Sequence, residues 1–492
     1  MASEPRPQRV VPGLSWPLYG VAATRALEHI ALSLAAPHVL MQRAGLATAR
    51  LCLALHPHAD TFWVAAGPGN NGGDGLEAAA RLRQQGKTVF ATWSGDLHNA
   101  TADVAASCRH ALAAGVMFAD APPPQFDVCV DALLGIGANR APDGVIGHWI
   151  NSINLSGRPV LSVDIPTGLN ADTGTASPLC VRAAATLCLL TLKPGLFTTD
   201  GRDASQSVWL DDLGVDWSAP ALHAAPPADA SLLPAPTRKP AMHGAHKGSR
   251  GDVVVIGGAT GMAGAAVLAG MAALHQGAGR VYLALLDAAS GSPSQLHAEL
   301  MLRDAATVDL SKASVVCGCG GGTAVAEHLP RVLSCARRLV LDADGLNTIA
   351  SDSKLQHQLR SRHSRGWQTV LTPHPLEAAR LLGCSTAEVQ RDRCQAASRL
   401  ARDYACVVVL KGSGTVIVAP EGRCAIVPVG NARLATAGTG DVLAGAIAAA
   451  MANGQSALAA AQGSAYRHAR CADLWPANQT FTASKLAVAS WC

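Results

Sequence analysis

Short apolar runs alternate with longer segments rich in Ala, Leu and Arg through the first part of the chain. The apolar runs predict buried strands, and the segments between them predict crossover helices. Alternation of this kind indicates a parallel sheet with helices on both faces. The predicted strands are TFWVAAG, KTVFATW, FDVCVDALLG, RPVLSVDI, AATLCLLTL and SVWLDDLG.

A second alternating series follows residues 218–240, a Pro- and Ala-rich stretch that predicts an extended linker. The alternative for part of this stretch is a short packed arm. Helices are expected over 263–276 and from near Asp441, and Pro420-Glu421-Gly422 predicts the turn of a β-hairpin. The halves share no repeat, so the sequence predicts two different α/β domains, at 1–225 and 235–492. The predicted strands are GDVVVIGG, GRVYLALLD, ASVVCGCG, RRLVLDADG, QTVLTPH, ACVVVLKGSGTVIVAP and CAIVPVG.

The length, charge and composition of the chain exclude several classes of protein. The chain has 492 residues, too many for one ordinary core, and a net charge of only +4. It has no basic run with interleaved aromatics, no apolar stretch long enough to span a membrane, and no apolar core of a signal peptide at its start. We therefore expect a cytoplasmic protein with neither nucleic acid nor membrane as a partner.

The 14 cysteines do not predict a disulfide framework. Cys129, Cys188, Cys317 and Cys406 lie within apolar runs, where a thiol behaves as a small hydrophobe. Cys317-Gly318-Cys319 is the only close pair, and no matching His or Cys pair follows it, so a structural zinc site is not expected.

Residues 65–82, AAGPGNNGGDGLEAAARL, predict a strand, a glycine-rich loop and a helix over 76–85. This order directs backbone N–H groups at an anion, usually a phosphate. The loop fits neither the Rossmann fingerprint nor the P-loop. Asn70, Asn71 and Asp74 add oxygen donors that suit a cation. The alternative is a turn whose Asn and Gly residues only tolerate left-handed conformations.

Three further strand ends carry polar residues: Asp131 in VDALLGIG, Asp164 in VDIPTGL and Lys193 in LKPG. Ligands of open parallel sheets bind outside the carboxyl ends of the strands, where these turns converge. The alternative for the two acids is that they only cap the helices that follow.

GPGNNGGDG, VDALLGIG, VDIPTGL and LKPG together resemble the NAD(P)H-hydrate epimerase domain, over about residues 20–225. The resemblance implies a Rossmann-like fold that interconverts the R and S hydrates at ring carbon 6, with Asp164 as the acid/base in contact with the substrate. It also implies a K⁺ ion held by Asn71, Asp131 and Thr167. The implied dinucleotide contacts are Asn70, Asn71, Gly72, Gly73, Asp74, Gly135, Ile136, Gly137, Ala138, Asn139, Arg140 and Ala141.

In the second half, Gly438-Thr439-Gly440-Asp441 opens a predicted helix, and its backbone N–H groups form an anion hole. Asp441 at that position can take the proton of a hydroxyl that attacks a phosphoryl group. A plain helix start is the alternative. Lys411-Gly412-Ser413-Gly414-Thr415 adds a second phosphate-binding turn at a strand end.

The G-T-G-D ending is shared by ribokinase-like kinases. Together with VVVIGGATGMAGAAVLAGMAALHQGAG, LDADGLN, TPHPLEAARLLG, KGSGTVI and NARLATAGTGDVLAG, it resembles the ADP-dependent NAD(P)H-hydrate dehydratase, over about 235–490. The resemblance implies a ribokinase-like α/β domain in which ADP, or ATP in some branches, phosphorylates the S hydrate and loss of phosphate restores NAD(P)H. Mg²⁺ would bridge the phosphates. The implied nucleotide contacts are Lys411, Gly412, Ser413, Gly414, Thr415 and Gly440, and the implied hydrate contacts are Ala266, Gly320, His374 and Asp441, the last as catalytic base.

Three positions depart from the pattern of that family. The turn usually written G-P-G-L-G is Gly318-Cys319-Gly320-Gly321-Gly322, and Leu376 and Ala437 stand where Gly is common. His374 also has a purely structural interpretation, as the residue that starts a helix after Thr372-Pro373.

The leading hypothesis is a bifunctional metabolite-repair enzyme that acts on NADHX and NADPHX, the hydrates of NADH and NADPH, with ADP as co-substrate, and that forms a homo-oligomer. A second is a ribokinase-like small-metabolite kinase with a regulatory N-terminal dinucleotide-binding domain. A third makes the first domain a non-catalytic binding module.

Overall fold

The computed structural model describes residues 6–138, 140–237, 243–287 and 297–491. The chain divides into two compact units. The first contains the residues up to Val11 together with Trp16–Ser231, and the second contains Pro12–Ser15 together with the chain from Leu232 onward. Within the described residues, no helix is long and apolar enough to cross a membrane.

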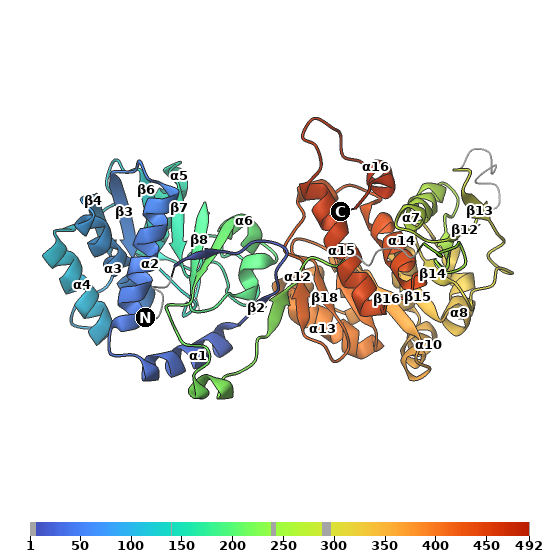
Figure 1. Cartoon of the computed structure of the whole chain (residues 1–492), viewed down its shortest axis with the longest axis horizontal. Helices are drawn as coiled ribbons and strands as arrows, with labels where there is room; N and C mark the ends of the chain where they lie inside the picture. The colour runs from blue at the N-terminus through green and yellow to red at the C-terminus, as the bar shows by residue number, and fades with distance from the viewer. Residues whose placement is uncertain (1–5, 139, 238–242, 288–296, 492) are drawn as a thin grey trace. The chain divides into compact units, whose positions relative to one another are not determined.

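The first unit has an eight-stranded sheet in the order β1-β9-β8-β7-β6-β3-β4-β5, in which only β1 runs antiparallel to its neighbour (Figure 1). The strand order reverses between β3 and β6, which makes the gap between their carboxyl ends the topological switch point. Its elements are β1 (Gln8–Arg9), β2 (Trp16–Leu18), α1 (Val21–Leu34), α2 (Val39–Leu55), β3 (Thr61–Ala66), α3 (Asn70–Gln84), β4 (Thr88–Trp93), α4 (Ala102–Ala114), β5 (Met117–Phe118), β6 (Val128–Ala132), α5 (Gly144–Leu155), β7 (Val160–Val163), β8 (Ala185–Leu189), η1 (Pro194–Phe197), α6 (Gly201–Ser205), β9 (Ser207–Asp211), η2 (Pro220–Ala224) and β10 (Ala230–Leu232).

Alternate residues of β3 face different helix layers, because side chains of a strand point to opposite faces. Phe62 and Val64 belong to a buried cluster that includes residues of α2 and α3. Trp63 belongs to a second cluster, with Trp149 of α5. Both faces of this strand are therefore covered, and the predicted parallel sheet with helices on both faces is confirmed.

The second unit is also built on a mostly parallel sheet, but its strands follow a different order. Its parallel strands run in the order β13-β12-β11-β14-β15-β16-β17, and β18 and β19 continue the sheet antiparallel. Its elements are β11 (Asp252–Gly257), α7 (Ala263–His275), β12 (Arg280–Leu285), β13 (Leu300–Leu302), β14 (Ser314–Cys317), α8 (Val325–Cys335), β15 (Arg338–Leu341), α9 (Ala343–Ser351), α10 (Ser353–Ser364), β16 (Gln368–Leu371), α11 (Pro375–Leu382), α12 (Thr386–Arg391), α13 (Arg393–Tyr404), β17 (Val407–Leu410), β18 (Val416–Val418), β19 (Cys424–Ile426), η4 (Ala432–Leu434), α14 (Thr439–Ala452), α15 (Ala457–Asp473) and α16 (Ala483–Val488).

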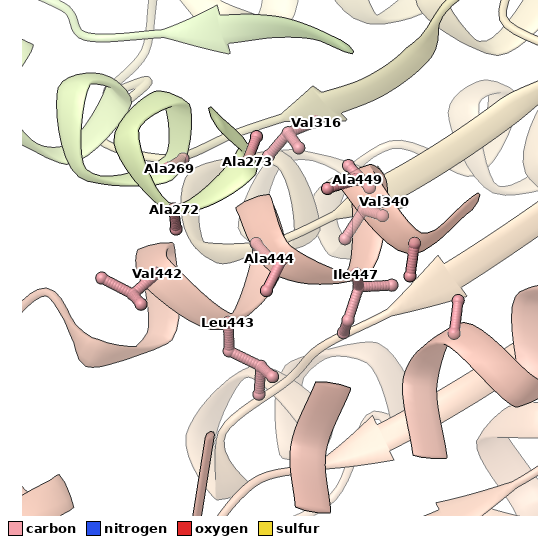
Figure 2. Packing of buried hydrophobic residues seen from close by; sticks show 14 of the residues in the cluster. Ala269, Ala272, Ala273, Val316, Val340, Val442, Leu443, Ala444, Ile447 and Ala449 are labelled. Carbon is pink, nitrogen blue, oxygen red and sulfur yellow. The ribbon is translucent and has the colours of Figure 1, made fainter. Parts of the chain in front are cut away.

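Small residues let α7 and α14 pack closely against one face of this sheet (Figure 2). A Cβ added at Gly445 would lie 2.0 Å from the carbonyl oxygen of Ala269, so the two helix backbones nearly touch. Val316 of β14 and Val340 of β15 pack beneath them. This packing holds the start of α14 over the carboxyl ends of the strands.

Two local predictions needed correction. The run at 405–420 forms two antiparallel strands, β17 and β18, because Gly412 and Gly414 adopt positive φ and turn the chain between them. The predicted hairpin then forms between β18 and β19. The segment at 218–240 is not extended throughout, since it contains η2 and β10 and part of it is therefore a packed arm; its residues 238–240 lie outside the described residues.

Candidate active sites

A cavity of about 480 Å³ lies in the first unit at the switch point between β3 and β6. Asp164, which follows β7, and Lys193, which follows β8, also line it, so four strand ends converge there as predicted. The predicted substrate residues that line the cavity are Asn70, Asn71, Asp74, Gly135, Ile136, Gly137, Ala138 and Asp164. Gly72, Gly73, Arg140 and Ala141 are not among the lining residues, and Asn139 lies outside the described residues.

The glycine-rich stretch is not a loop, because α3 already begins at Asn70. Its glycines are required by close packing: a Cβ at Gly72 would lie 1.9 Å from the carbonyl oxygen of Gly67, and one at Gly75 would lie 2.4 Å from Cβ of Ala132. Neither residue has a positive φ, so the left-handed alternative is wrong for them. The helix start thus sits directly on the ends of β3 and β6, with Asn70 at the cavity.

Asp131 at the end of β6 is fully buried and joins the carboxyl ends of β6 and β7. One carboxylate oxygen accepts hydrogen bonds from the Ser162 hydroxyl at 2.8 Å and the Thr167 N–H at 2.9 Å. The other accepts from the Thr167 hydroxyl at 2.7 Å and the Leu133 N–H at 3.3 Å. Burial raises the pKa of Asp131, and these bonds oppose that rise. The helix-cap alternative is therefore wrong for Asp131.

Asn71 lies on the cavity wall with only 9% of its surface exposed. Neither its amide oxygen nor its amide nitrogen has a hydrogen-bond partner among the described residues. A buried amide without partners is costly, so a ligand is expected to satisfy it. Amide, carboxylate and hydroxyl oxygens suit a hard cation, and the residues Asn71, Asp131 and Thr167 fit the implied K⁺ ion in their chemistry.

Asp164 adopts a left-handed backbone conformation with φ of 66°, which is uncommon for any residue other than Gly. Its carboxylate forms an ion pair with Lys193, whose side chain is completely buried. Lys193 also donates a hydrogen bond to the Leu189 carbonyl oxygen at 3.0 Å. A strained backbone fixed by a buried counter-charge is typical of a functional position, and it excludes a helix cap as the main role of Asp164.

Helix α1 brings two residues to the cavity that the sequence patterns did not reveal, Arg25 and Glu28. Burial raises the pKa of Glu28, and the charge of Asp164 adds to that rise. The pKa of Asp74 is likewise raised well above its usual value by burial, then by Asp164 and Glu28. The first site therefore gathers three acids around one buried lysine. Only the spacing of Arg25 and Glu28, one turn apart on an amphipathic helix, could have indicated them.

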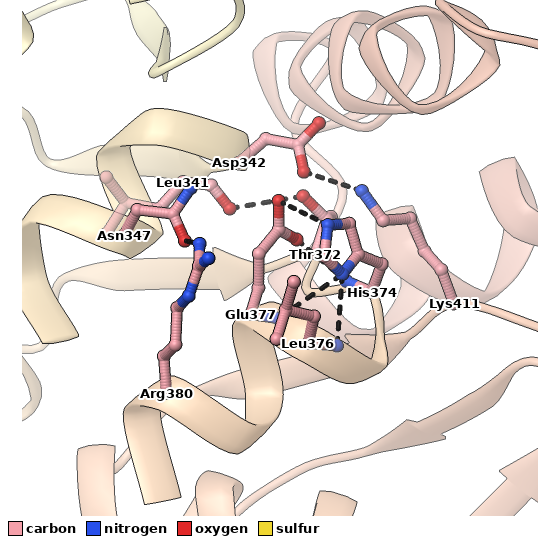
Figure 3. Close-up of polar contacts among 9 residues, drawn as sticks. All are labelled: Leu341, Asp342, Asn347, Thr372, His374, Leu376, Glu377, Arg380 and Lys411. Atoms are coloured by element: carbon pink, nitrogen blue, oxygen red, sulfur yellow. Dashed lines mark hydrogen bonds and ion pairs between the residues drawn. The ribbon is translucent and has the colours of Figure 1, made fainter. Parts of the chain in front are cut away.

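The second site forms where β15, β16 and β17 end (Figure 3). Asp342 follows β15 and accepts a hydrogen bond from Nζ of Lys411, which follows β17, at 2.7 Å. Burial lowers the pKa of Lys411, but Asp342 and Glu377 outweigh it, so the net shift is upward and the lysine stays charged. Asp342 lies within the quoted LDADGLN motif, but sequence reasoning assigned it no role.

The predicted nucleotide turn after β17 is shaped by a buried arginine that sequence reasoning missed. Arg393 donates to the carbonyl oxygens of Leu410 and Lys411, both at 3.1 Å. Gly412 has φ of 137°, and a Cβ there would meet the guanidinium of Arg393 at 2.8 Å. Gly440 completes this region, because a Cβ on it would lie 3.1 Å from Nζ of Lys411. The nucleotide residues predicted on α14 and after β17 thus lie together.

His374 caps α11, as its structural interpretation predicts. Its Nδ1 accepts hydrogen bonds from the N–H groups of Leu376 and Glu377 at 3.1 and 3.2 Å, and Glu377 accepts from the N–H of His374 at 2.7 Å (Figure 3). Burial and Lys411 lower the pKa of His374, while burial raises the pKa of Glu377 to about 7. The imidazole remains 47% exposed, so a neutral ring is available to a ligand.

Asp441 lies in the first turn of α14, behind an N-cap glycine, Gly438, with φ of 89°. Ligand atoms of Asp441, Asp342 and Cys319 lie within 4.8 Å of one another. Burial and the charge of Asp342 raise the pKa of Asp441 to about 7, against the hydrogen bond from Cys319 and the charge of Lys411. Its carboxylate is therefore suited to accept a proton near neutral pH.

Two further predicted hydrate residues lie at the switch point of the second unit, between β11 and β14. Ala266 is completely buried on α7. Gly320 adopts φ of 57°, and a Cβ there would lie 2.7 Å from the carbonyl oxygen of Met262.

The four cysteines predicted to be core residues are all buried, and the cysteines that the structure describes are free thiols.

The fold and the two sites define an enzyme with two α/β domains, each with an active site at the carboxyl ends of its parallel strands and a lysine–aspartate ion pair in that site. Residues 253–490 match the family profile described as NAD(P)H-hydrate dehydratase, and residues 37–195 match the one described as YjeF-related protein N-terminus. Similar proteins include the bifunctional NAD(P)H-hydrate repair enzyme Nnr of Escherichia coli K12, 37% identical over 88% of this chain and 84% of that one. The same-named enzyme of Coxiella burnetii is 36% identical over 93% of this chain and 94% of that one.

The chain therefore belongs to the family of bifunctional NAD(P)H-hydrate repair enzymes. Its function is the repair of NAD(P)H hydrates, and the kinase alternative is not supported. Among solved structures, an ADP/ATP-dependent NAD(P)H-hydrate dehydratase of Bacillus subtilis, co-crystallised with ATP and Mg²⁺, is 29% identical over 51% of this chain and 90% of that one, with a TM-score of 0.43.

Proposed function

We propose that residues 1–225 form the epimerase domain, that 218–240 link the domains, and that 235–492 form the dehydratase domain. In the first domain, Asp164 is the acid/base that acts on the hydrated ring, and Lys193 keeps its carboxylate in place. The cavity at the switch point supports this assignment, because Asp164 and the start of α3 line the same space. The pyrophosphate is expected at the amino end of α3, where N–H groups favour an anion.

We propose that K⁺ is held by Asn71, Asp131 and Thr167, and that it fixes the loops around the dinucleotide. The unpartnered amide of Asn71 is the observation that supports this ion. Thermal unfolding of the full chain in KCl should therefore lie above that in choline chloride, and Asn71→Ala should remove the difference. A native protein whose unfolding is indifferent to K⁺ would contradict the proposal, whatever the activity.

In the second domain, Asp441 takes the proton of the hydrate hydroxyl as that oxygen attacks the terminal phosphoryl group of the nucleotide. The hydroxyl oxygen gains the phosphoryl group, AMP leaves when ADP is the donor, and loss of inorganic phosphate restores NAD(P)H. Lys411 to Thr415 and Gly440 hold the nucleotide, and Ala266, Gly320 and His374 contact the hydrate. Mg²⁺ bound with the nucleotide would neutralise phosphate charge. The main support for this proposal is the pKa of Asp441, which is raised to about 7 even though the charge of Lys411 opposes the rise.

The test uses an equilibrated mixture of R and S NADH hydrate with ADP, Mg²⁺ and K⁺, and follows the return of reduced-nicotinamide absorbance. Native protein should repair both epimers. Asp164→Asn should repair the S fraction rapidly and the R fraction only at the uncatalysed rate, and Asp441→Asn should lose about 10³-fold in dehydration. Rapid complete repair by Asp164→Asn, or normal rates with Asp441→Asn, would overturn the corresponding assignment.

Two finer points follow from the resemblance to the family. We propose ADP rather than ATP as the co-substrate, with both NADHX and NADPHX accepted, and parallel assays with each nucleotide and each hydrate test this. We also propose a homo-oligomer that works in the cytoplasm. Light scattering of the purified chain and fractionation of cells that express it test these two expectations.

A further inference from the structure

The turn after β14 carries a thiol in the position where the family pattern has proline. Cys319 lies between Gly318 and Gly320, with φ of 117° and 57°. The carbonyl oxygens of Cys319 and Gly320 accept hydrogen bonds from the N–H groups of Gly258 and Ala259 at 3.0 and 2.7 Å. The N–H of Gly318 also donates to the Ile256 carbonyl oxygen at 3.0 Å, so the backbone on both sides of Cys319 is bonded to the end of β11 and the direction of its side chain is fixed.

That side chain points at the proposed catalytic base. Sγ of Cys319, a carboxylate oxygen of Asp342 and one of Asp441 lie within 4.8 Å of one another, and Cys319 has no exposed surface. Burial, and then the charge of Asp441, raise the pKa of the Cys319 thiol well above its usual value. The sulfur therefore stays protonated, as a hydrogen-bond donor and not as a nucleophile.

We propose that Cys319 is a positioning residue of the dehydratase, whose thiol donates a hydrogen bond to the Asp441 carboxylate and holds it ionised and oriented toward the hydrate hydroxyl. The inference rests on the proposed role of Asp441 as the base. It adds a residue to that site which the family pattern does not contain.

The charges around Asp441 explain why a weak donor matters there. Asp342 and Asp344 both favour the protonated carboxyl. Lys411 opposes them, but its Nζ is already engaged by Asp342. His468, which donates to the Thr439 carbonyl oxygen beneath the start of α14, is neutral because burial lowers its pKa to about 4. A donor aimed at the carboxylate itself therefore shifts the balance toward the ionised form.

The experiment compares kcat/KM for dehydration between pH 5 and 9 in native protein, Cys319→Ala and Cys319→Ser. In Cys319→Ala, the acidic limb of the profile of kcat/KM against pH should move to higher pH. The value of kcat/KM should fall about three- to tenfold at pH 6 and much less at pH 8.5. Cys319→Ser should keep the native limb, because its hydroxyl also donates. Cys317→Ala is the matched control: this thiol is equally buried two residues away, and its own raised pKa is due to burial alone.

An unchanged limb in Cys319→Ala would overturn the inference, and so would an equal shift in Cys319→Ser or Cys317→Ala. Epimerase rates and thermal unfolding of each variant separate a local effect from a loss of folded protein. Asp441→Asn distinguishes the two proposals. If it retains dehydration, the base assignment fails; if it is inactive while Cys319→Ala keeps the native limb, only the role of Cys319 fails.

Discussion

The two sites use a lysine and an aspartate in opposite ways. In the first, Lys193 pairs directly with Asp164, the acid proposed to act on the substrate. In the second, Lys411 pairs with Asp342, and Asp441 lies beside this pair with a pKa raised to about 7. The same type of fold thus gives one acid a fixed counter-charge and leaves the other ready to accept a proton.

Glycine serves the two units differently as well. In the first, Gly72 and Gly75 lie inside α3 and are needed because neighbouring backbone and side chains approach closely. In the second, Gly318, Gly320 and Gly438 adopt positive φ and shape the turns around Asp441. One site is therefore built by packing a helix onto strand ends, and the other by bending the chain.

The largest expected effect tests the ion pair of the second site. Lys411→Met leaves the buried Asp342 charge without its partner and should destabilise the second unit by about 3–5 kcal/mol in denaturant unfolding of the full chain. The double variant Lys411→Met/Asp342→Asn should recover most of that loss, since it removes both charges. If the double variant is no more stable than the single one, charge is not the cause.

The second prediction concerns the packed glycines. Gly72→Ala places a Cβ 1.9 Å from the Gly67 carbonyl oxygen and should destabilise the first unit by about 2–3 kcal/mol. Gly69→Ala is the control, because a Cβ there meets nothing within 4 Å. Calorimetry of the full chain should show a lower transition for Gly72→Ala alone. Equal effects of the two substitutions would mean that close packing does not explain this glycine.

The smallest expected effect tests the charge of Asp441 through stability. Its pKa is raised from 3.8 unfolded to about 7 folded, so the folded state binds the proton more tightly. The stability that this proton provides is complete below pH 4 and is lost as pH rises through 7. Asp441→Asn, which is always neutral, should therefore be more stable than native protein by about 1–2 kcal/mol at pH 8 and by less than half of that at pH 5.

Denaturant unfolding at the two pH values measures this difference, with Asp309→Asn as the matched control. Asp309 has a pKa lowered by hydrogen bonds from Ser311 and should show no gain at pH 8. A gain for Asp441→Asn that is equal at pH 5 and pH 8 would contradict the raised pKa.

The sequence by itself determined the class of fold and the strand-end positions of most site residues. Apolar runs such as 61–66 and 252–257 are strands because burial on both faces leaves little room for polar residues, and parallel strands bring their carboxyl ends to one edge. That rule alone directed attention to Asp131, Asp164, Lys193 and Lys411. The roles given to them came from the resemblance of their motifs to a known family.

Only the tertiary structure decided which of these groups meet. No sequence spacing relates Lys411 to Asp342 rather than to Asp441, or brings Cys319 beside Asp441, because these residues lie on different strands and helices. Arg25 and Glu28 reach the first cavity through the docking of α1, which has no motif of its own. A pKa near 7 for Asp441 likewise depends on burial and on neighbouring charges, and both exist only once the chain has folded.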